Sequence, residues 1–179
     1  MPDEPDTFQR LTDAAQQGGL DFLLIGGHEV NAHGYERTTV DLDLLIPASG
    51  LERWKEILNQ LGYSLVRQVE DFAQFKPTGD EDYRVDLMLV DDATFGKLMA
   101  GSEWVDYGRR RTRVAGVLHL IALKLHACRT PMRATDYDIL QLIRLNRIDT
   151  ESEEFREILK RYATPSIRER LLRDIGFNP

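Results

Sequence analysis

Two aspartates separated by one residue could bind a metal ion. Asp41 and Asp43 lie in the segment VDLDLLI, residues 40–46, whose alternation predicts a strand. Because side chains alternate between the two faces of a strand, both carboxylates point to the same side. The apolar positions that alternate with the aspartates are expected to point into the core: Val40, Leu42 and Leu44. Like charges about 7 Å apart on a half-buried strand repel each other, and a divalent cation is the usual compensation.

A third carboxylate, Asp86, interrupts the segment YRVDLMLV, residues 83–90, which is otherwise nearly all apolar. If this strand lies beside the Asp41 strand, the three acids could hold two metal ions. One ion would activate an attacking hydroxyl and the other would bind a triphosphate. The alternative for Asp41 and Asp43 alone is an edge strand with its acids in water, but Asp86 favours a metal site. We therefore predict that Asp41, Asp43 and Asp86 are catalytic and bind metal.

A double glycine precedes the paired acids. Gly26 and Gly27 end the predicted strand 21–25 and open a helix, where backbone N–H groups can approach a triphosphate closely. Arg37 and Thr39 come just before Asp41, where a guanidinium could bind phosphate and a hydroxyl could hold the loop. Steric needs of the turn are the alternative for the glycines, and loop solvation is the alternative for Arg37 and Thr39.

The elements that must position these residues follow from periodicity and from glycine and proline breaks. The predicted strands are 21–25, 40–46, 63–69, 72–76, 84–90 and 110–114. The predicted helices are 7–17, one after Gly27, 51–61, 93–99, 118–129, 136–146, 153–162 and 166–174. This order predicts an α/β (α+β) fold with a small mixed sheet flanked by helices. We expect a core domain at residues 1–117 and a C-terminal helical subdomain at residues 118–179.

Composition limits the classes of function. The 179 residues carry a formal net charge of −7, which argues against a broadly basic surface for gripping nucleic acid. A local run of arginines at 109–113 reads first as a solvated strand or turn and second as a substrate-binding patch. Cys128 is the single cysteine, so an internal disulfide is excluded, which fits a protein in the reducing cytoplasm. We expect Cys128 to be a core residue and not a nucleophile. The histidines lack zinc-site spacing, and no apolar run is long enough to cross a membrane.

These residues together resemble the nucleotidyltransferase superfamily of DNA polymerase beta, whose pattern is a glycine turn, paired acids on one strand and a later third acid. The run from Gly26-Gly27 through His33-Gly34 to the paired acids is similar to AbiE-type (AbiEii-like) toxin nucleotidyltransferases. The downstream segments LKLHACR and RATDYDI extend this likeness. The resemblance covers roughly residues 22–145 at the level of motifs.

The resemblance implies a nucleotidyltransferase that uses Mg²⁺, two ions per site with Mn²⁺ as the alternative metal, to move a nucleotidyl group from a nucleoside triphosphate to an acceptor. It implies that Lys124 contacts the triphosphate and that Asp138 assists catalysis or positions the nucleotide. A lysine snorkelling at the edge of a core helix is the alternative for Lys124. A capping box from Thr135 is the alternative for Asp138, and Asp136 is an equal candidate for either role.

The resemblance also suggests an acceptor. RNA, such as a tRNA end, is expected for a toxin-type role, and a protein acceptor is expected for an antitoxin-type enzyme with a cognate toxin partner. A nucleotide-binding module without turnover is the alternative from another class, and it predicts triphosphate binding that survives loss of Asp86.

Overall fold

A computed structural model describes residues 6–36, 38–79, 83–107, 110–127 and 136–176. The chain divides into two compact units. The first comprises Met1–Ala32 with Arg37–Ala115, and the second comprises His33–Glu36 with Gly116–Pro179. None of the helices in the described ranges is both long and apolar enough to cross a bilayer.

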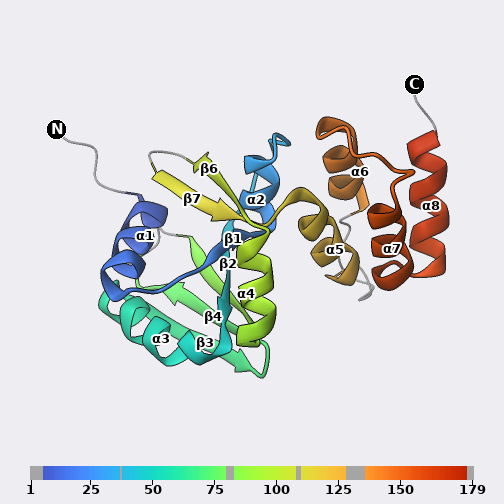
Figure 1. The fold of residues 1–179 in the computed structure, drawn as a ribbon. Coiled ribbons are helices and arrows are strands. Elements are labelled where there is room, and N and C mark those ends of the chain that lie inside the picture. The colour runs from blue at the N-terminus through green and yellow to red at the C-terminus, as the bar shows by residue number, and fades with distance from the viewer. Residues whose placement is uncertain (1–5, 37, 80–82, 108–109, 128–135, 177–179) are drawn as a thin grey trace. The chain divides into compact units, whose positions relative to one another are not determined.

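The first unit combines helices and strands (Figure 1). In chain order they are α1 (Thr7–Gly18), β1 (Leu23–Ile25), α2 (Gly26–Ala32), β2 (Asp41–Pro47), the short 3-10 helix η1 (Ala48–Gly50), α3 (Leu51–Gln60), β3 (Tyr63–Val69), β4 (Phe72–Pro77), β5 (Arg84–Val90), α4 (Asp92–Ala100), β6 (Glu103–Tyr107) and β7 (Arg110–Val114). Asp6 caps α1 and Asp91 caps α4, each accepting a backbone N–H with its carboxylate.

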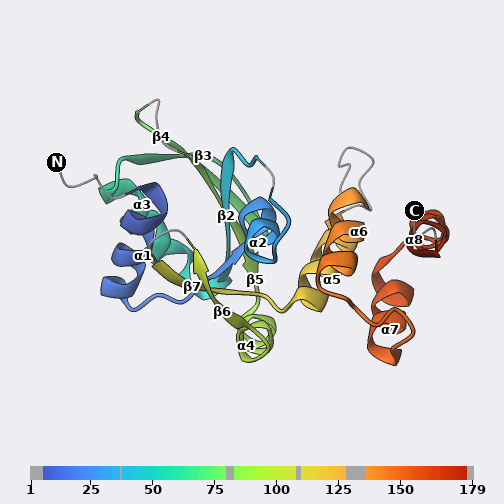
Figure 2. The ribbon, with the colours of Figure 1, turned by 90° about the horizontal axis from the view of Figure 1, so that it is seen from above.

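The described strands form one seven-stranded sheet in the order β3-β4-β5-β2-β1-β7-β6. Pairing is parallel between β2 and β5 and between β1 and β7, and antiparallel elsewhere. Figure 2 shows α1 and α3 on one face of this sheet and α2 and α4 on the other. The predicted fold class, a mixed sheet flanked by helices, is confirmed.

The core lies between the sheet and the pair α1 and α3. Leu42 and Leu44 of β2 and Val85 and Leu87 of β5 point to this side and are buried, as is Trp54 of α3. Removal of these side chains from water contributes roughly 1.5–3 kcal/mol each. Since neighbouring positions on a strand point to opposite faces, the aspartates between these leucines and valines point to the face of α2 and α4.

One predicted core position is wrong. Val40 was expected to point inward with the alternating leucines, but its side chain is 70% exposed. The strand begins at Asp41, one residue later, so Val40 lies outside the alternation that would have turned it toward the core.

The second unit contains α5 (Val117–Ala127), α6 (Asp136–Leu145), α7 (Glu153–Tyr162) and α8 (Pro165–Gly176). In it α5 packs against α6 and α7, and α6 packs against α8. Their buried side chains include Leu125, Ile139, Leu142 and Phe155. Each helix has an apolar stripe that is buried only because another helix covers it.

The sequence-based elements differ from the structure at a few places. The strand predicted over residues 21–25 is only Leu23–Ile25, and β6 was not predicted, because Glu103 and Asp106 dilute its apolar alternation. The predicted roles of Arg37, Cys128 and Thr135 lie outside the described residues, as do Arg109 and the end of the helix predicted over 118–129.

Candidate active site

The three predicted carboxylates lie on two neighbouring strands. β5 pairs with β2 in parallel, and Asp43 is the direct partner of Asp86 in the register. Asp41 is two residues before Asp43 on β2 and therefore points to the same face. Adjacent strands are about 4.8 Å apart, so the backbone brings these positions into one cluster. The condition set by the sequence, that the Asp86 strand lie beside the Asp41 strand, is met.

Gly26 lies against the carboxylate of Asp43. A Cβ built at residue 26 would be 2.6 Å from Cγ and 2.8 Å from Cβ of Asp43, closer than real side chains approach. Gly26 also has a φ of +73°, a left-handed conformation that favours glycine. The double glycine therefore has a steric reason: the chain turns from β1 into α2 directly over Asp43. Gly27, the second glycine, is buried in the first turn of α2.

The side chains of the three aspartates are not arranged as a metal-binding cluster. Within the described ranges, no set of three or more His, Cys, Asp or Glu side chains is arranged so that it could hold a metal ion. One oxygen of Asp86 accepts a hydrogen bond from Nε2 of Gln74 at 3.0 Å. The metal-binding role of the aspartates stays a prediction.

The donor set nevertheless suits a hard divalent cation. Two carboxylates at directly paired positions repel each other, and oxygen-only ligands are those that Mg²⁺ prefers. Asp86 is buried, with 8% of its surface exposed, while Asp41 and Asp43 are half-buried. A metal ion bound at this face would compensate charges that are partly removed from water.

Two neighbours of the aspartates were missed by the sequence analysis. Gln74 of β4 is the direct partner of Asp86 in the antiparallel pair of β4 and β5, and Arg84 of β5 is the direct partner of Asp41. Gln74 could have been noticed as a lone amide between the apolar residues of FAQFKP. Arg84 could not, because only the register of β5 against β2 brings it beside an acid.

His28 of α2 lies in a group of aromatic side chains. Its ring packs edge-on against Tyr83 and Tyr107, with ring centroids 5.5 and 5.4 Å away, and its Nδ1 hydrogen-bonds the Tyr107 hydroxyl. Burial lowers the pKa of His28 and raises the pKa of Tyr107. A neutral imidazole and a neutral phenol form the stable pair here. The His28 ring is thus held by aromatic packing and by this hydrogen bond.

Thr39 holds the start of β2. Its hydroxyl donates to the main-chain carbonyl of Asp41 at 3.3 Å, which is the loop-holding interaction considered from the sequence. Its predicted contact with a nucleotide stays a prediction, as does that of Arg37.

Lys124 and Asp138 form a buried ion pair in the second unit. Lys124 Nζ is 2.9 Å from Oδ2 of Asp138, and both residues are more than nine-tenths buried. Lys124 is therefore not snorkelling into water. Each charge has the partner that burial demands. Their predicted nucleotide-binding roles stay predictions.

No protein-family model matches the chain, and no curated protein sequence matches it. Solved structures do. The solution structure of the antibiotic-resistance factor ANT(2'')-Ia matches with a TM-score of 0.66 at 14% identity, over 94% of this chain and 93% of that chain. Its crystal structure in complex with adenylyl-2''-tobramycin matches with a TM-score of 0.64 at 18% identity, over 91% and 95%.

A third solved structure is the lincosamide antibiotic adenylyltransferase LnuA with lincomycin bound. It matches with a TM-score of 0.59 at 17% identity, over 78% of this chain and 98% of that chain. The chain therefore has the same fold as these solved structures.

Proposed function

We propose that this chain is a magnesium-dependent nucleotidyltransferase that moves a nucleotidyl group from a nucleoside triphosphate to an acceptor hydroxyl. The observation that carries the proposal is the parallel register that pairs Asp43 with Asp86 and brings Asp41 to the same face, on a nucleotidyltransferase fold. Asp41, Asp43 and Asp86 would hold the metal, which would stabilise charge on the triphosphate and lower the pKa of the acceptor hydroxyl.

The bonds, the leaving group and the proton of the proposed reaction can all be accounted for with the residues on the acidic face. The acceptor oxygen forms a bond to the α-phosphorus, the bond to the bridging oxygen breaks, and pyrophosphate leaves. The hydroxyl proton passes to Asp86, the most buried of the three carboxylates. Gly26 has no side chain to cover Asp43, so a triphosphate can approach the acids at the turn into α2.

A small hydroxylated molecule is the acceptor class that we favour. The net charge of −7 attracts a cationic acceptor, leaves a neutral one unaffected and repels a polyanion. The structurally similar proteins ANT(2'')-Ia and LnuA are solved with adenylyl-2''-tobramycin and with lincomycin, and the match to ANT(2'')-Ia spans nearly the whole of both chains. A hydroxylated antibiotic is therefore the first acceptor to test.

RNA is the second candidate acceptor. The observation in its favour is the arginine row of β7, which includes Arg110, Arg111 and Arg113. An AbiE-type toxin role, a protein acceptor and a cognate toxin or antitoxin partner stay predictions that depend on which acceptor is labelled.

The test is transfer of label from each α-labelled nucleoside triphosphate with Mg²⁺. Acceptors would be aminoglycosides and lincosamides, total RNA and lysate protein, with pyrophosphate release measured in parallel. We expect labelled small molecules with the native protein and at least about a thousandfold less transfer with Asp41→Asn/Asp43→Asn, because the metal ligands are lost.

Asp106→Asn is the matched control. Asp106 is an exposed aspartate on β6 of the same sheet, so Asp106→Asn removes one carboxylate charge, half of the change in the double variant, without altering Asp41, Asp43 or Asp86. Label found only on RNA or only on protein would show that the acceptor is that macromolecule and not a small molecule. Triphosphate binding without transfer to any acceptor, unchanged by Asp86→Asn, would contradict enzymatic function and favour a nucleotide-binding module.

A further inference from the structure

A second candidate site lies in the first unit, at the other end of β1 from the acidic face. β1 runs from Leu23 to Ile25 and then enters the Gly26 turn over Asp43. The residues just before β1 line a cavity of about 440 Å³ together with α1, β6 and β7. Its polar and aromatic lining includes Thr12, Gln16, Asp21, Trp104, Arg111 and Arg113. Pockets of this size hold small molecules.

Trp104 and two arginines form the wall of this cavity on β6 and β7. Trp104 is the direct cross-strand partner of Arg113. The guanidinium carbons of Arg113 and Arg111 lie 5.5 and 5.8 Å from the centre of the indole, within cation–π distance. Arg113 also donates from Nη2 to the main-chain carbonyl of Met99 at 2.8 Å. The arginines are thus ordered by contacts of their own.

These groups are more than a solvated patch. Trp104 is 55% exposed, so its indole ring is accessible to a ligand in the cavity. Nε of Arg113 is buried without a hydrogen-bond partner among the described residues. Hydrogen-bonding capacity in the lining is therefore unused, which costs free energy until a partner is supplied.

The chemistry of the lining points to an anion that also carries hydroxyl groups. Guanidinium groups match the oxygens of phosphate in a bidentate fashion. Asp21 contributes a carboxylate that accepts from hydroxyls and disfavours a second anionic group nearby. Thr12 and Gln16 of α1 add neutral polar groups at the same cavity.

We propose that this cavity binds a phosphate monoester of a small hydroxylated molecule. Arg111 and Arg113 take the phosphate, Trp104 packs against the organic part and Asp21 accepts from its hydroxyls. This inference does not depend on the proposed nucleotidyl transfer, because it uses none of the three aspartates on the acidic face. A small ligand is favoured over an RNA strand because α1 and Asp21 bound the cavity, whereas a strand requires an open basic groove.

The experiment is an NMR titration of the indole N–H signals in buffer with EDTA. The chain has two tryptophans, Trp104 and the fully buried Trp54, so one signal reports the cavity and the other is an internal reference. Ribose 5-phosphate and adenosine monophosphate would be titrated, with ribose, adenosine and inorganic phosphate as partial ligands. We expect a saturable shift of the Trp104 signal with the monoesters and weaker binding of each part.

Arg111→Gln should weaken binding of the monoesters by about tenfold or more, the loss of one charge-assisted contact. Arg67→Gln is the matched control, since Arg67 is an exposed arginine on β3 at the opposite edge of the sheet, and it should leave binding unchanged. Asp41→Asn should also leave it unchanged, whatever happens to nucleotidyl transfer. A Trp104 signal that does not move, or that moves equally in Arg111→Gln, would overturn the proposal. Binding of an oligoribonucleotide without the monoesters would overturn it too.

Discussion

Gly26 lies directly over the carboxylate of Asp43, so that residue 26 has no room for even a methyl group. This contact links the turn after β1 to the acidic face of β2. Both the left-handed backbone at Gly26 and its closeness to Asp43 require glycine.

Gly26→Ala should therefore lower both stability and activity. Left-handed strain should cost about 1–2 kcal/mol, and displacement of Asp43 should lower kcat by about a hundredfold. Urea unfolding and transfer kinetics would measure the two effects. Gly19→Ala is the control, because Gly19 has a φ of +65° with nothing within 4 Å of a built Cβ. It should lose similar stability with unchanged kcat. Equal kinetics of the two variants would contradict the role of the contact.

Gln74 is a positioning residue for Asp86. Gln74→Met removes the donor at 3.0 Å while keeping the size of the side chain, so kcat should fall by about tenfold with little change in KM for the triphosphate. Gln68→Met, on the exposed strand β3, should have no effect. A rise in KM with unchanged kcat would instead indicate a contact to the bound nucleotide.

The ion pair of Lys124 and Asp138 should be detectable in stability. Lys124→Met leaves the Asp138 carboxylate buried without this partner, which should cost about 3–5 kcal/mol in urea unfolding. The double variant Lys124→Met/Asp138→Leu should recover most of that loss. Its affinity for triphosphate then tests the predicted nucleotide role in a folded protein. If the double variant binds triphosphate as tightly as the native protein, the Lys124–Asp138 pair has a structural role only.

Tyr107 should make stability depend on alkaline pH. Burial first, and the nearby Tyr83 second, raise the pKa of Tyr107 above its ordinary 10.0. The unfolded chain then loses this proton at lower pH than the folded chain. The contribution is fully present below pH 10.0 and is lost as the pH rises through the folded-state pKa. Between about pH 8 and about pH 11, the unfolding free energy should decrease more for the native protein than for Tyr107→Phe. Parallel curves would contradict this.

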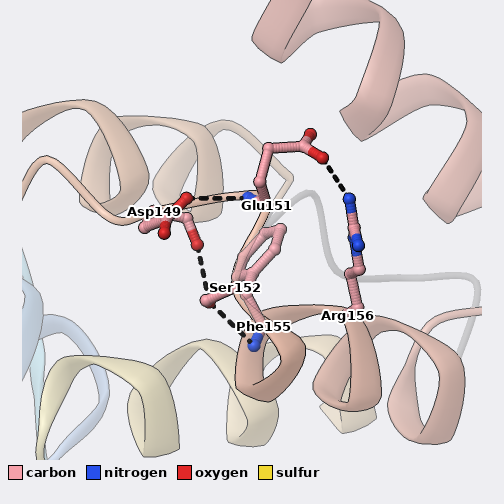
Figure 3. Close-up of polar contacts among 5 residues, drawn as sticks. All are labelled: Asp149, Glu151, Ser152, Phe155 and Arg156. Atoms are coloured by element: carbon pink, nitrogen blue, oxygen red, sulfur yellow. Dashed lines mark hydrogen bonds and ion pairs between the residues drawn. The ribbon is translucent and has the colours of Figure 1, made fainter.

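Ser152 caps α7, as Figure 3 shows. Its hydroxyl accepts from the backbone N–H of Phe155 at 3.3 Å and donates to the carbonyl of Asp149 at 2.7 Å. Ser152→Ala should reduce the unfolding free energy by about 1 kcal/mol. Ser64→Ala, at an exposed serine on β3, should change it much less. If both cost the same, the cap contributes nothing specific.

The sequence by itself determined the features that depend on neighbouring residues. The one-residue spacing of Asp41 and Asp43 put both carboxylates on one face, because strand geometry has a period of two. Gly26 and Gly27 marked the turn, and helical periodicity located most of the helices. The fold class followed from the order of these elements.

Only the tertiary structure decided what lies beside the acids. Two strands, β3 and β4, separate β2 from β5 along the chain, and local sequence does not specify which residues pair across such a connection. The parallel register of β2 with β5 places Asp86 opposite Asp43 and Arg84 opposite Asp41. Gln74 meets Asp86 for the same reason. These contacts are set by long-range hydrogen-bond register and core packing, which residue types and spacing do not encode.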